Sequence, residues 1–139
     1  MTTAKVSVEV KASADKVFGR LGDFAGVSGP LIKEKKITGS GIGCLRDLVL
    51  ANGARVLERC DNHDANSRTL TYSILNEDHP LPFSTYVATL TVTPTGADSC
   101  RVDWWSNFSP RGASEEEAIK VAQGIYTGAI KGAQIALGV

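Results

Sequence analysis

The sequence lacks the features that mark membrane-spanning, secreted and nucleic-acid-binding proteins. No apolar run is long enough to cross a bilayer, and Met1 leads into an alternating segment without the apolar stretch of a signal peptide. Lysine plus arginine and aspartate plus glutamate balance at 15 each, so no excess of basic charge favours nucleic acid or an anionic membrane. We therefore expect a cytoplasmic protein with no nucleic-acid partner and no membrane insertion.

Residues that bind metals or form disulfides are also scarce. The three cysteines, Cys44, Cys60 and Cys100, are odd in number and lack Cys-x-x-Cys spacing, which favours reduced thiols. His63 and His79 fall in predicted loops without supporting Cys, Asp or Glu residues, so we expect no metal site and no cofactor. His79 stands in a proline-rich loop expected near a binding site, where it is a candidate acid or base.

The pattern of apolar residues predicts a single α+β domain covering residues 1–139. A long helix is expected from Ser114 to about Leu137, and two short helices, one capped by Ser13 and one near residues 23–26, should follow the first strand. Serial hairpins imply a curved antiparallel sheet that wraps around the long C-terminal helix. Alternation predicts its seven strands near residues 5–11, 32–38, 44–50, 54–61, 70–74, 86–92 and 102–108.

The hairpin over residues 44–61 has two possible registers. A two-residue turn would place Arg46 opposite Arg59, whereas a three-residue loop with Gly53 in the left-handed conformation places Arg46 opposite Glu58. We favour the second register because it pairs opposite charges and sets apolar residues beside each other.

The long helix carries a glycine at every fourth position, at Gly124, Gly128 and Gly132. Each costs about 1 kcal/mol relative to alanine in a helix interior, so the tertiary structure should compensate. Two interpretations fit: the close approach of a neighbouring backbone, or space for something that is not protein. A membrane dimer motif fits poorly, because Lys120 and Lys131 interrupt any apolar span. The expected apolar face of the helix comprises Ile119, Ala122, Ile125, Tyr126, Ala129, Ala133 and Leu137.

The order of these elements and several short motifs resemble a known superfamily across essentially the whole chain. The motifs are Val17-Phe18, Leu21-Gly22-Asp23-Phe24, Gly41-Ile42-Gly43 before Arg46, Asn52-Gly53 before Glu58, Tyr72-Ser73-Ile74, Leu81-Pro82-Phe83 with Tyr86, and Val102-Asp103-Trp104 to Phe108. With these motifs the chain resembles the START-like (SRPBCC) superfamily with the helix-grip fold, in its polyketide cyclase/dehydrase-type branch. One departure is Ser28-Gly29-Pro30, where many relatives have a tryptophan before the proline.

The resemblance implies a large apolar cavity between the sheet and the long helix, used to bind hydrophobic small molecules. Members of the superfamily include lipid carriers, hormone receptors and enzymes of cyclisation, dehydration or condensation, so the fold alone does not define the activity. Predicted inward faces supply mostly apolar walls with a few convergent polar groups. The candidate ligand-binding residues are Arg46, Leu48, Val56, Glu58, Tyr72, Tyr86, Trp104, Ser106 and Phe108 from the sheet, with Ala122, Tyr126 and Ala129 from the helix.

Arg46, Glu58 and Tyr72 are the candidate catalytic residues. Arg46 would hold a carboxylate or a developing enolate, Glu58 would orient it or act as a base, and Tyr72 would donate a hydrogen bond. The structural alternative is an ion pair that fixes the hairpin register or lies at the rim of the sheet, with each tyrosine serving as a core aromatic.

Three functions agree with these observations. The first is binding of a hydrophobic, aromatic or polyketide-like molecule in an internal cavity. The second is a metal-independent, lyase-type cyclase or dehydratase acting in the same cavity. The third is a protein-interaction module with Trp105 on the outer face of the sheet, and a homodimer is compatible with all three.

Overall fold

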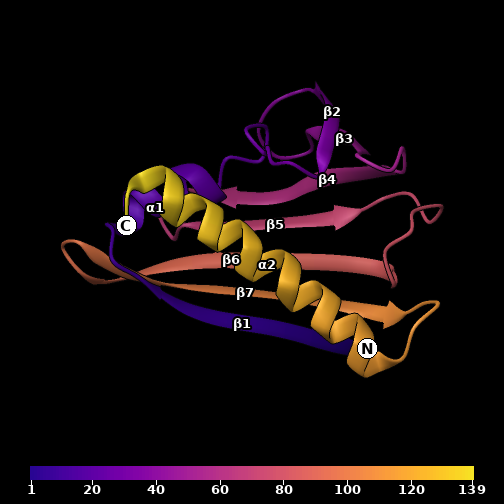
Figure 1. The fold of residues 1–139 in the computed structure, drawn as a ribbon. Coiled ribbons are helices and arrows are strands. Elements are labelled where there is room, and N and C mark those ends of the chain that lie inside the picture. Colours follow the sequence, from indigo (N-terminus) through magenta and orange to yellow (C-terminus); the bar gives the residue numbers. More distant parts are fainter.

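Seven strands form one antiparallel sheet in the computed structural model, which describes residues 1–139 (Figure 1). The strand order is β1-β7-β6-β5-β4-β3-β2, so the first strand pairs with the last. The long helix α2 crosses one face of the curved sheet, which confirms the predicted helix-grip arrangement (Figure 1). The strands are β1 (Thr2–Val10), β2 (Ile32–Thr38), β3 (Leu45–Leu50), β4 (Arg55–Asp64), β5 (Thr69–Ile74), β6 (Phe83–Gly96) and β7 (Ser99–Pro110).

One short helix, and not the predicted two, follows β1. In α1 (Ala14–Leu21), the Ser13 hydroxyl accepts a hydrogen bond from the backbone N–H of Lys16 at 3.3 Å and so caps the first turn. The second predicted helix is a turn, in which the N–H of Gly26 donates to the backbone oxygen and the side chain of Asp23, both at 3.1 Å. So short a segment, followed closely by a proline, does not offset the cost of helix nucleation.

The long helix α2 (Glu115–Leu137) begins at the predicted cap, where Ser114 accepts a hydrogen bond from the N–H of Glu117 at 3.1 Å. Its buried face is turned slightly from the predicted one, because Ile125 is 42% exposed and Ala129 is exposed. The residues that α2 buries are Ala118, Ala122, Tyr126, Ile130 and Ala133.

The predicted register of the β3–β4 hairpin is confirmed. Arg46 lies opposite Glu58, and Leu48 lies opposite Val56. Gly53 adopts φ 85°, a left-handed conformation that residues with a Cβ rarely accept, and its N–H donates to Leu50 at 2.8 Å. The turn therefore sets which side chains of β3 and β4 face the helix.

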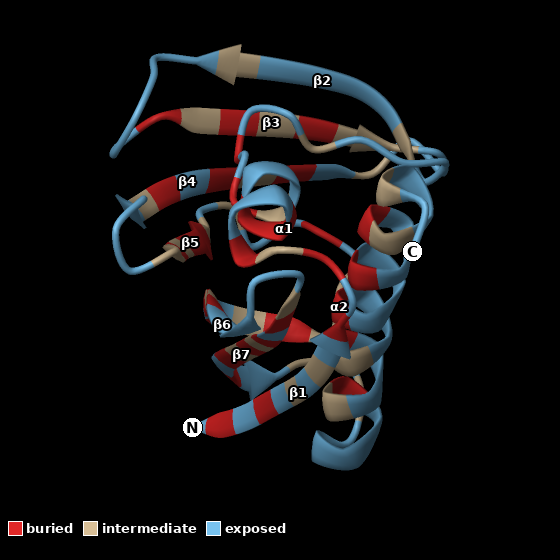
Figure 2. Cartoon of the chain, turned by 90° about the vertical axis from the view of Figure 1, so that its left-hand side faces the viewer, coloured by how far each residue is buried: buried red, intermediate tan, exposed pale blue.

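Aromatic side chains fill much of the space between the sheet and α2. Phe83 packs against Phe108 and Tyr86, with ring centroids 4.6 and 5.0 Å apart. Trp104 stacks on Tyr126 of α2, with centroids 4.7 Å apart. Figure 2 shows that buried residues cover the inner face of the sheet, whereas the edge strand β2 is mostly exposed. The solid core therefore lies towards the first turns of α2, and open space remains beside its C-terminal half.

Candidate functional site: a cavity between the sheet and the C-terminal half of α2

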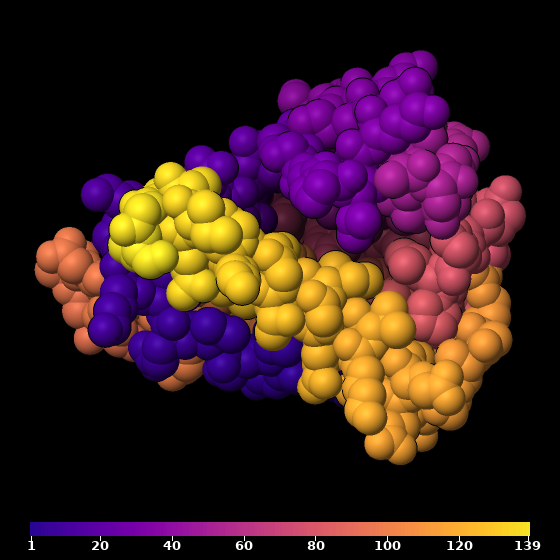
Figure 3. Space-filling model, in the orientation of Figure 1, coloured from indigo at the N-terminus to yellow at the C-terminus, as the bar shows by residue number.

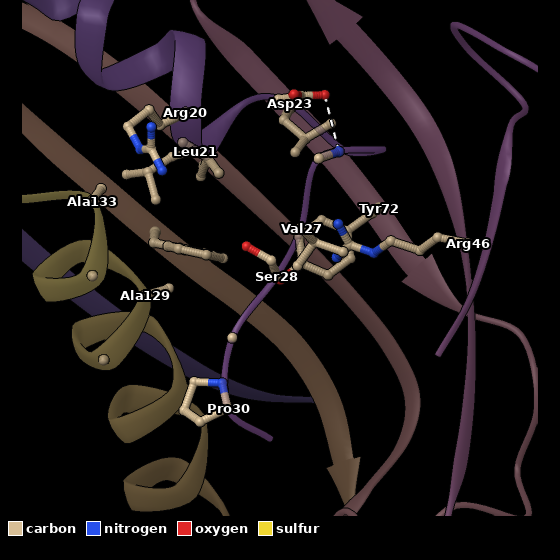
Figure 4. Close-up of a pocket in the computed structure, with 17 residues that line it drawn as sticks. Arg20, Leu21, Asp23, Val27, Ser28, Pro30, Arg46, Tyr72, Ala129 and Ala133 are labelled. Atoms are coloured by element: carbon tan, nitrogen blue, oxygen red, sulfur yellow. Dashed lines mark hydrogen bonds between the residues drawn. The ribbon is translucent and has the colours of Figure 1, made fainter. Parts of the chain in front are cut away.

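A cavity of about 380 Å³ opens between the sheet, α2 and the loop that follows α1. Figure 3 shows the recess between the helix and the purple segment above it, and Figure 4 shows the side chains that surround it. The lining residues come from α1 and its loop (Arg20, Leu21, Asp23, Gly26, Val27, Ser28, Gly29, Pro30), from the sheet (Arg46, Leu70, Tyr72, Leu90, Trp104) and from α2 (Gly128, Ala129, Gly132, Ala133).

Arg46 is the buried cation of this cavity and is only 8% exposed. Its Nε donates to Glu58 Oε1 at 2.6 Å, and its Nη1 donates to the backbone oxygen of Phe24 at 3.1 Å. The guanidinium carbon lies 4.0 Å from the ring centroid of Phe24 and 5.0 Å from that of Tyr72, so both rings add cation–π attraction. These contacts offset the cost of burying the charge and fix its orientation.

The Arg46 side chain reaches from β3 towards Tyr72 and Ser28 (Figure 4). Its Nε and Nη1 donate these two hydrogen bonds, whereas its Nη2 donates none. The site therefore offers a fixed, charged N–H donor at the cavity wall.

Three buried tyrosines extend from the cavity into the core. Tyr72 lines the cavity, while the hydroxyls of Tyr86 and Tyr126 form a hydrogen bond with each other deeper inside. Burial raises the pKa of Tyr72 and of Tyr86 well above the usual value and raises the pKa of Tyr126 to about 12. All three phenols are therefore protonated near neutral pH and act as hydrogen-bond donors.

Trp104 lines the cavity and is 7% exposed, but its indole Nε1 is fully buried and has no hydrogen-bond partner. A buried N–H without an acceptor is costly. The Ser106 hydroxyl is likewise buried and unpartnered, but Ser106 does not line the cavity.

The glycines of α2 leave open space and do not admit a neighbouring backbone. A Cβ placed on Gly124, Gly128 or Gly132 would meet no atom within 4 Å. This excludes the interpretation that close backbone packing requires them. Gly128 and Gly132 line the cavity, whereas Gly124 does not.

The predicted binding residues divide into several groups in the structure. Glu58 holds Arg46 without lining the cavity, and Leu48 and Val56 form a buried cross-strand pair apart from the main core. Of the twelve predicted residues, Arg46, Tyr72, Trp104 and Ala129 line the cavity, while Tyr86, Ser106, Phe108, Ala122 and Tyr126 are buried in the solid core.

Sequence reasoning missed the loop wall of the cavity and the two apolar positions Leu70 and Leu90. The loop at 23–30 has no apolar periodicity that would have placed it, whereas the four-residue spacing of glycine did point to open space. Leu70 and Leu90 belonged to the predicted inward faces, but alternation alone does not show where a core is hollow.

His79 lies outside the cavity lining, in the loop between β5 and β6. Its Nδ1 accepts a hydrogen bond from the N–H of Leu81 at 3.2 Å, and the Arg111 guanidinium donates to its backbone oxygen at 2.5 Å. Burial, followed by the charge of Arg111, lowers the pKa of His79. These contacts tie the loop to the segment that precedes α2.

The other residues considered in the sequence analysis pack against neighbouring side chains or are buried. His63 packs against Phe18 with ring centroids 5.3 Å apart, and Trp105 is partly covered by Lys5, whose Nζ lies 5.8 Å from the indole centroid. The three cysteines are buried free thiols.

No three His, Cys, Asp or Glu side chains gather as a metal site would require. Neither helix has the length and apolar character needed to cross a membrane.

A comparison of the sequence with protein families finds a match over nearly the whole chain. Residues 1–134 match the family described as polyketide cyclase / dehydrase and lipid transport. The chain belongs to this family. No curated protein matches it in sequence.

Solved structures share the same fold. XoxI from Bacillus cereus is 32% identical, with a TM-score of 0.85 over 98% of this chain and 95% of that chain. An uncharacterized protein from Bacillus thuringiensis is 31% identical, with a TM-score of 0.84 over 96% of this chain and 97% of that chain. Truncated norcoclaurine synthase from Thalictrum flavum is 20% identical, with a TM-score of 0.74 over 99% of this chain and 92% of that chain, a likeness of fold alone.

Proposed function

We propose that this family member binds a hydrophobic small molecule, aromatic or polyketide-like, in the cavity beside α2. The observation that carries the proposal is a hollow whose apolar walls surround one fixed buried cation, Arg46. Its volume of about 380 Å³ falls within the range of ligand pockets. Gly128 and Gly132 support the proposal, because they keep space open at a cost in helix stability.

The relatives support the same class of ligand. The family description includes both polyketide cyclases and lipid transport. Norcoclaurine synthase, which shares the fold, has been solved in complex with dopamine and hydroxybenzaldehyde, so this architecture accommodates aromatic molecules.

Titration with N-phenyl-1-naphthylamine, an apolar aromatic fluorophore, tests the proposal. We expect saturable binding at one site per chain. Ala129→Phe should abolish that binding because the larger side chain fills the cavity, whereas Ala136→Phe, at an exposed position of α2 outside the cavity lining, should leave it unchanged. Absence of saturable binding, or equal affinity in the wild type and Ala129→Phe, would overturn the proposal.

Catalysis of a cyclisation or dehydration in the same cavity is a second candidate function. The favouring observation is that two donors, the Arg46 guanidinium and the protonated Tyr72 phenol, belong to the same cavity wall. Such donors stabilise an enolate oxygen that develops during carbon–carbon bond formation or loss of water. Glu58 would orient Arg46, because it contacts the guanidinium and does not line the cavity.

Turnover of an aromatic poly-β-ketone separates catalysis from simple binding. Arg46→Met and Tyr72→Phe should each lower kcat about 100-fold or more if they supply the oxyanion donors. Circular dichroism would verify that each variant stays folded. Unchanged rates in both folded variants would remove the catalytic assignment and leave ligand binding in place.

A further inference from the structure

The charges around the cavity limit the chemical group that Arg46 can receive. The charged residues of the lining are Arg20, Asp23 and Arg46, and Glu58 contacts Arg46 at 2.6 Å. Two positive and two negative side chains therefore belong to the site. Because Glu58 neutralises the buried guanidinium, Arg46 acts as a hydrogen-bond donor and not as an unpaired positive charge.

A ligand carboxylate and a ligand carbonyl would bind to Arg46 Nη2 with different affinities. A ligand carboxylate bound to Nη2 would place a second anion on a guanidinium that already holds Glu58, and the other lining cation, Arg20, is exposed, so water weakens its attraction for that anion. An uncharged carbonyl oxygen accepts the same N–H without adding charge to the site.

The rings beside Arg46 also restrict the approach of the ligand. Phe24 and Tyr72 lie 4.0 and 5.0 Å from the guanidinium carbon, as measured to their ring centroids. Nε and Nη1 each hold an acceptor, so Nη2 is the nitrogen of this lining residue that is left for a ligand. An acceptor on a flat apolar body fits this direction, because the remaining walls are largely apolar.

We propose that the ligand meets Arg46 with an uncharged oxygen acceptor, the carbonyl of a ketone, aldehyde or quinone, and that the site disfavours the matching carboxylate. This inference rests on the proposed binding function, and it selects one ligand class within it. Of the two groups expected from the sequence, it favours the carbonyl precursor of an enolate over a carboxylate.

The test compares two probes of nearly equal shape, 2-acetylnaphthalene and 2-naphthoate, by calorimetric titration at pH 7. We expect the ketone to bind at least about tenfold more tightly than the carboxylate. The hydrocarbon 2-isopropylnaphthalene, which has no acceptor, should bind more weakly than the ketone. Equal or tighter binding of 2-naphthoate would overturn the inference while leaving the proposed binding function intact, whereas binding of none of the probes would remove that function itself.

Two variants that add the same charge show whether Glu58 sets the preference. Glu58→Gln leaves Arg46 without its buried anion, so the affinity for 2-naphthoate should rise and the preference for the ketone should shrink or reverse. Asp47→Asn changes the net charge equally, on the strand β3 that carries Arg46, but Asp47 pairs with the exposed Arg55, so the preference should stay as in the wild type. An equal shift of the preference in both variants would overturn the inference. If Glu58→Gln does not fold, the ratio of the wild-type affinities for the ketone and the carboxylate decides alone.

Discussion

At the scale of single residues, Arg46 and Glu58 form the one ion pair of the molecule in which both partners are buried. The two residues are only 8% and 6% exposed, and Arg46 Nε lies 2.6 Å from Glu58 Oε1. A pair of this kind contributes little net stability, but removing one member leaves the other charge without compensation. Its presence in the wall of a cavity agrees with a role in recognition more than with a role in stability.

Denaturant unfolding measures this asymmetry. Arg46→Met should lower the free energy of unfolding by about 3–5 kcal/mol, because the Glu58 carboxylate stays buried and unpaired. The double variant Arg46→Met/Glu58→Met should recover most of the loss, since neither charge remains. A double variant as unstable as the single one would show that the pair matters through other contacts, such as the bond to Phe24.

His79 should make stability depend on pH. Its pKa is lowered in the folded protein, so the folded state disfavours the protonated ring, and protonation would also disrupt the bond that Nδ1 accepts from Leu81. The stabilisation is complete above the ordinary histidine pKa of 6.5 and is lost as the pH falls below it towards the lower pKa of the folded state.

We therefore expect the free energy of unfolding to fall between pH 7 and pH 5, with a shallower slope in His79→Asn, whose side-chain oxygen can replace the Nδ1 acceptor. His63→Asn, in a largely exposed part of β4, serves as the control and should keep the wild-type slope. Equal slopes in the wild type and His79→Asn would contradict the assignment.

At the scale of elements, α2 combines a stable cap with three destabilising glycines. The helix begins at the Ser114 cap and ends at Gly138, whose φ is 75°, so both ends are well defined. Between them, Gly124, Gly128 and Gly132 add flexibility and no contacts. The helix therefore gives up stability along the side that borders the cavity.

Alanine substitution separates the stability effect from the binding effect. Gly124→Ala, Gly128→Ala and Gly132→Ala should each raise the free energy of unfolding by about 0.5–1 kcal/mol, since no atom lies within 4 Å of the added Cβ. Only the changes at Gly128 and Gly132, which line the cavity, should weaken the binding of N-phenyl-1-naphthylamine. Weaker binding in Gly124→Ala as well would point to a general effect of helix rigidity.

The sequence predicted the elements well because their signals are local. Alternation defined the strands, and the turn at Gly53 with the charges of Arg46 and Glu58 defined the hairpin register. The prediction of a second short helix was wrong, because its few residues form a turn around Asp23 and Gly26.

The hollow was harder to predict than the elements. Phe83, Tyr86 and Phe108 belong to strands whose inner faces look alike in sequence, yet they fill one end of the interior and leave the other open. That outcome depends on sheet curvature and on side-chain packing across several strands, which a one-dimensional pattern does not contain.

At the scale of the whole molecule, the half of the sheet near β1 and the half near β2 differ in how tightly they are packed. The main core joins α1 and α2 to β1, β5, β6 and β7 and includes only Cys60 from β4, whereas Leu48 of β3 and Val56 of β4 lie outside it. The edge strand β2 is largely exposed on both faces (Figure 2). The cavity therefore lies between a firmly packed side and a lightly packed one.

Hydrogen exchange followed by mass spectrometry should reveal this division. Amides of β6 and β7 should exchange most slowly, while those of β2 and of the loop at 23–30 should exchange fast, because few buried contacts hold them. Saturating N-phenyl-1-naphthylamine should slow exchange in the loop at 23–30 and leave β1 unchanged. Uniform protection across the sheet would contradict the unequal packing.

The hydrogen bond from Arg46 to the backbone oxygen of Phe24 joins β3 to the loop at 23–30, which forms part of the cavity wall. A guest that draws on the same guanidinium would alter the strength of this bond, and by thermodynamic reciprocity a change in the loop would alter the affinity for the guest. Substitutions in this loop should therefore change how long the guest stays, even at positions that the guest does not touch.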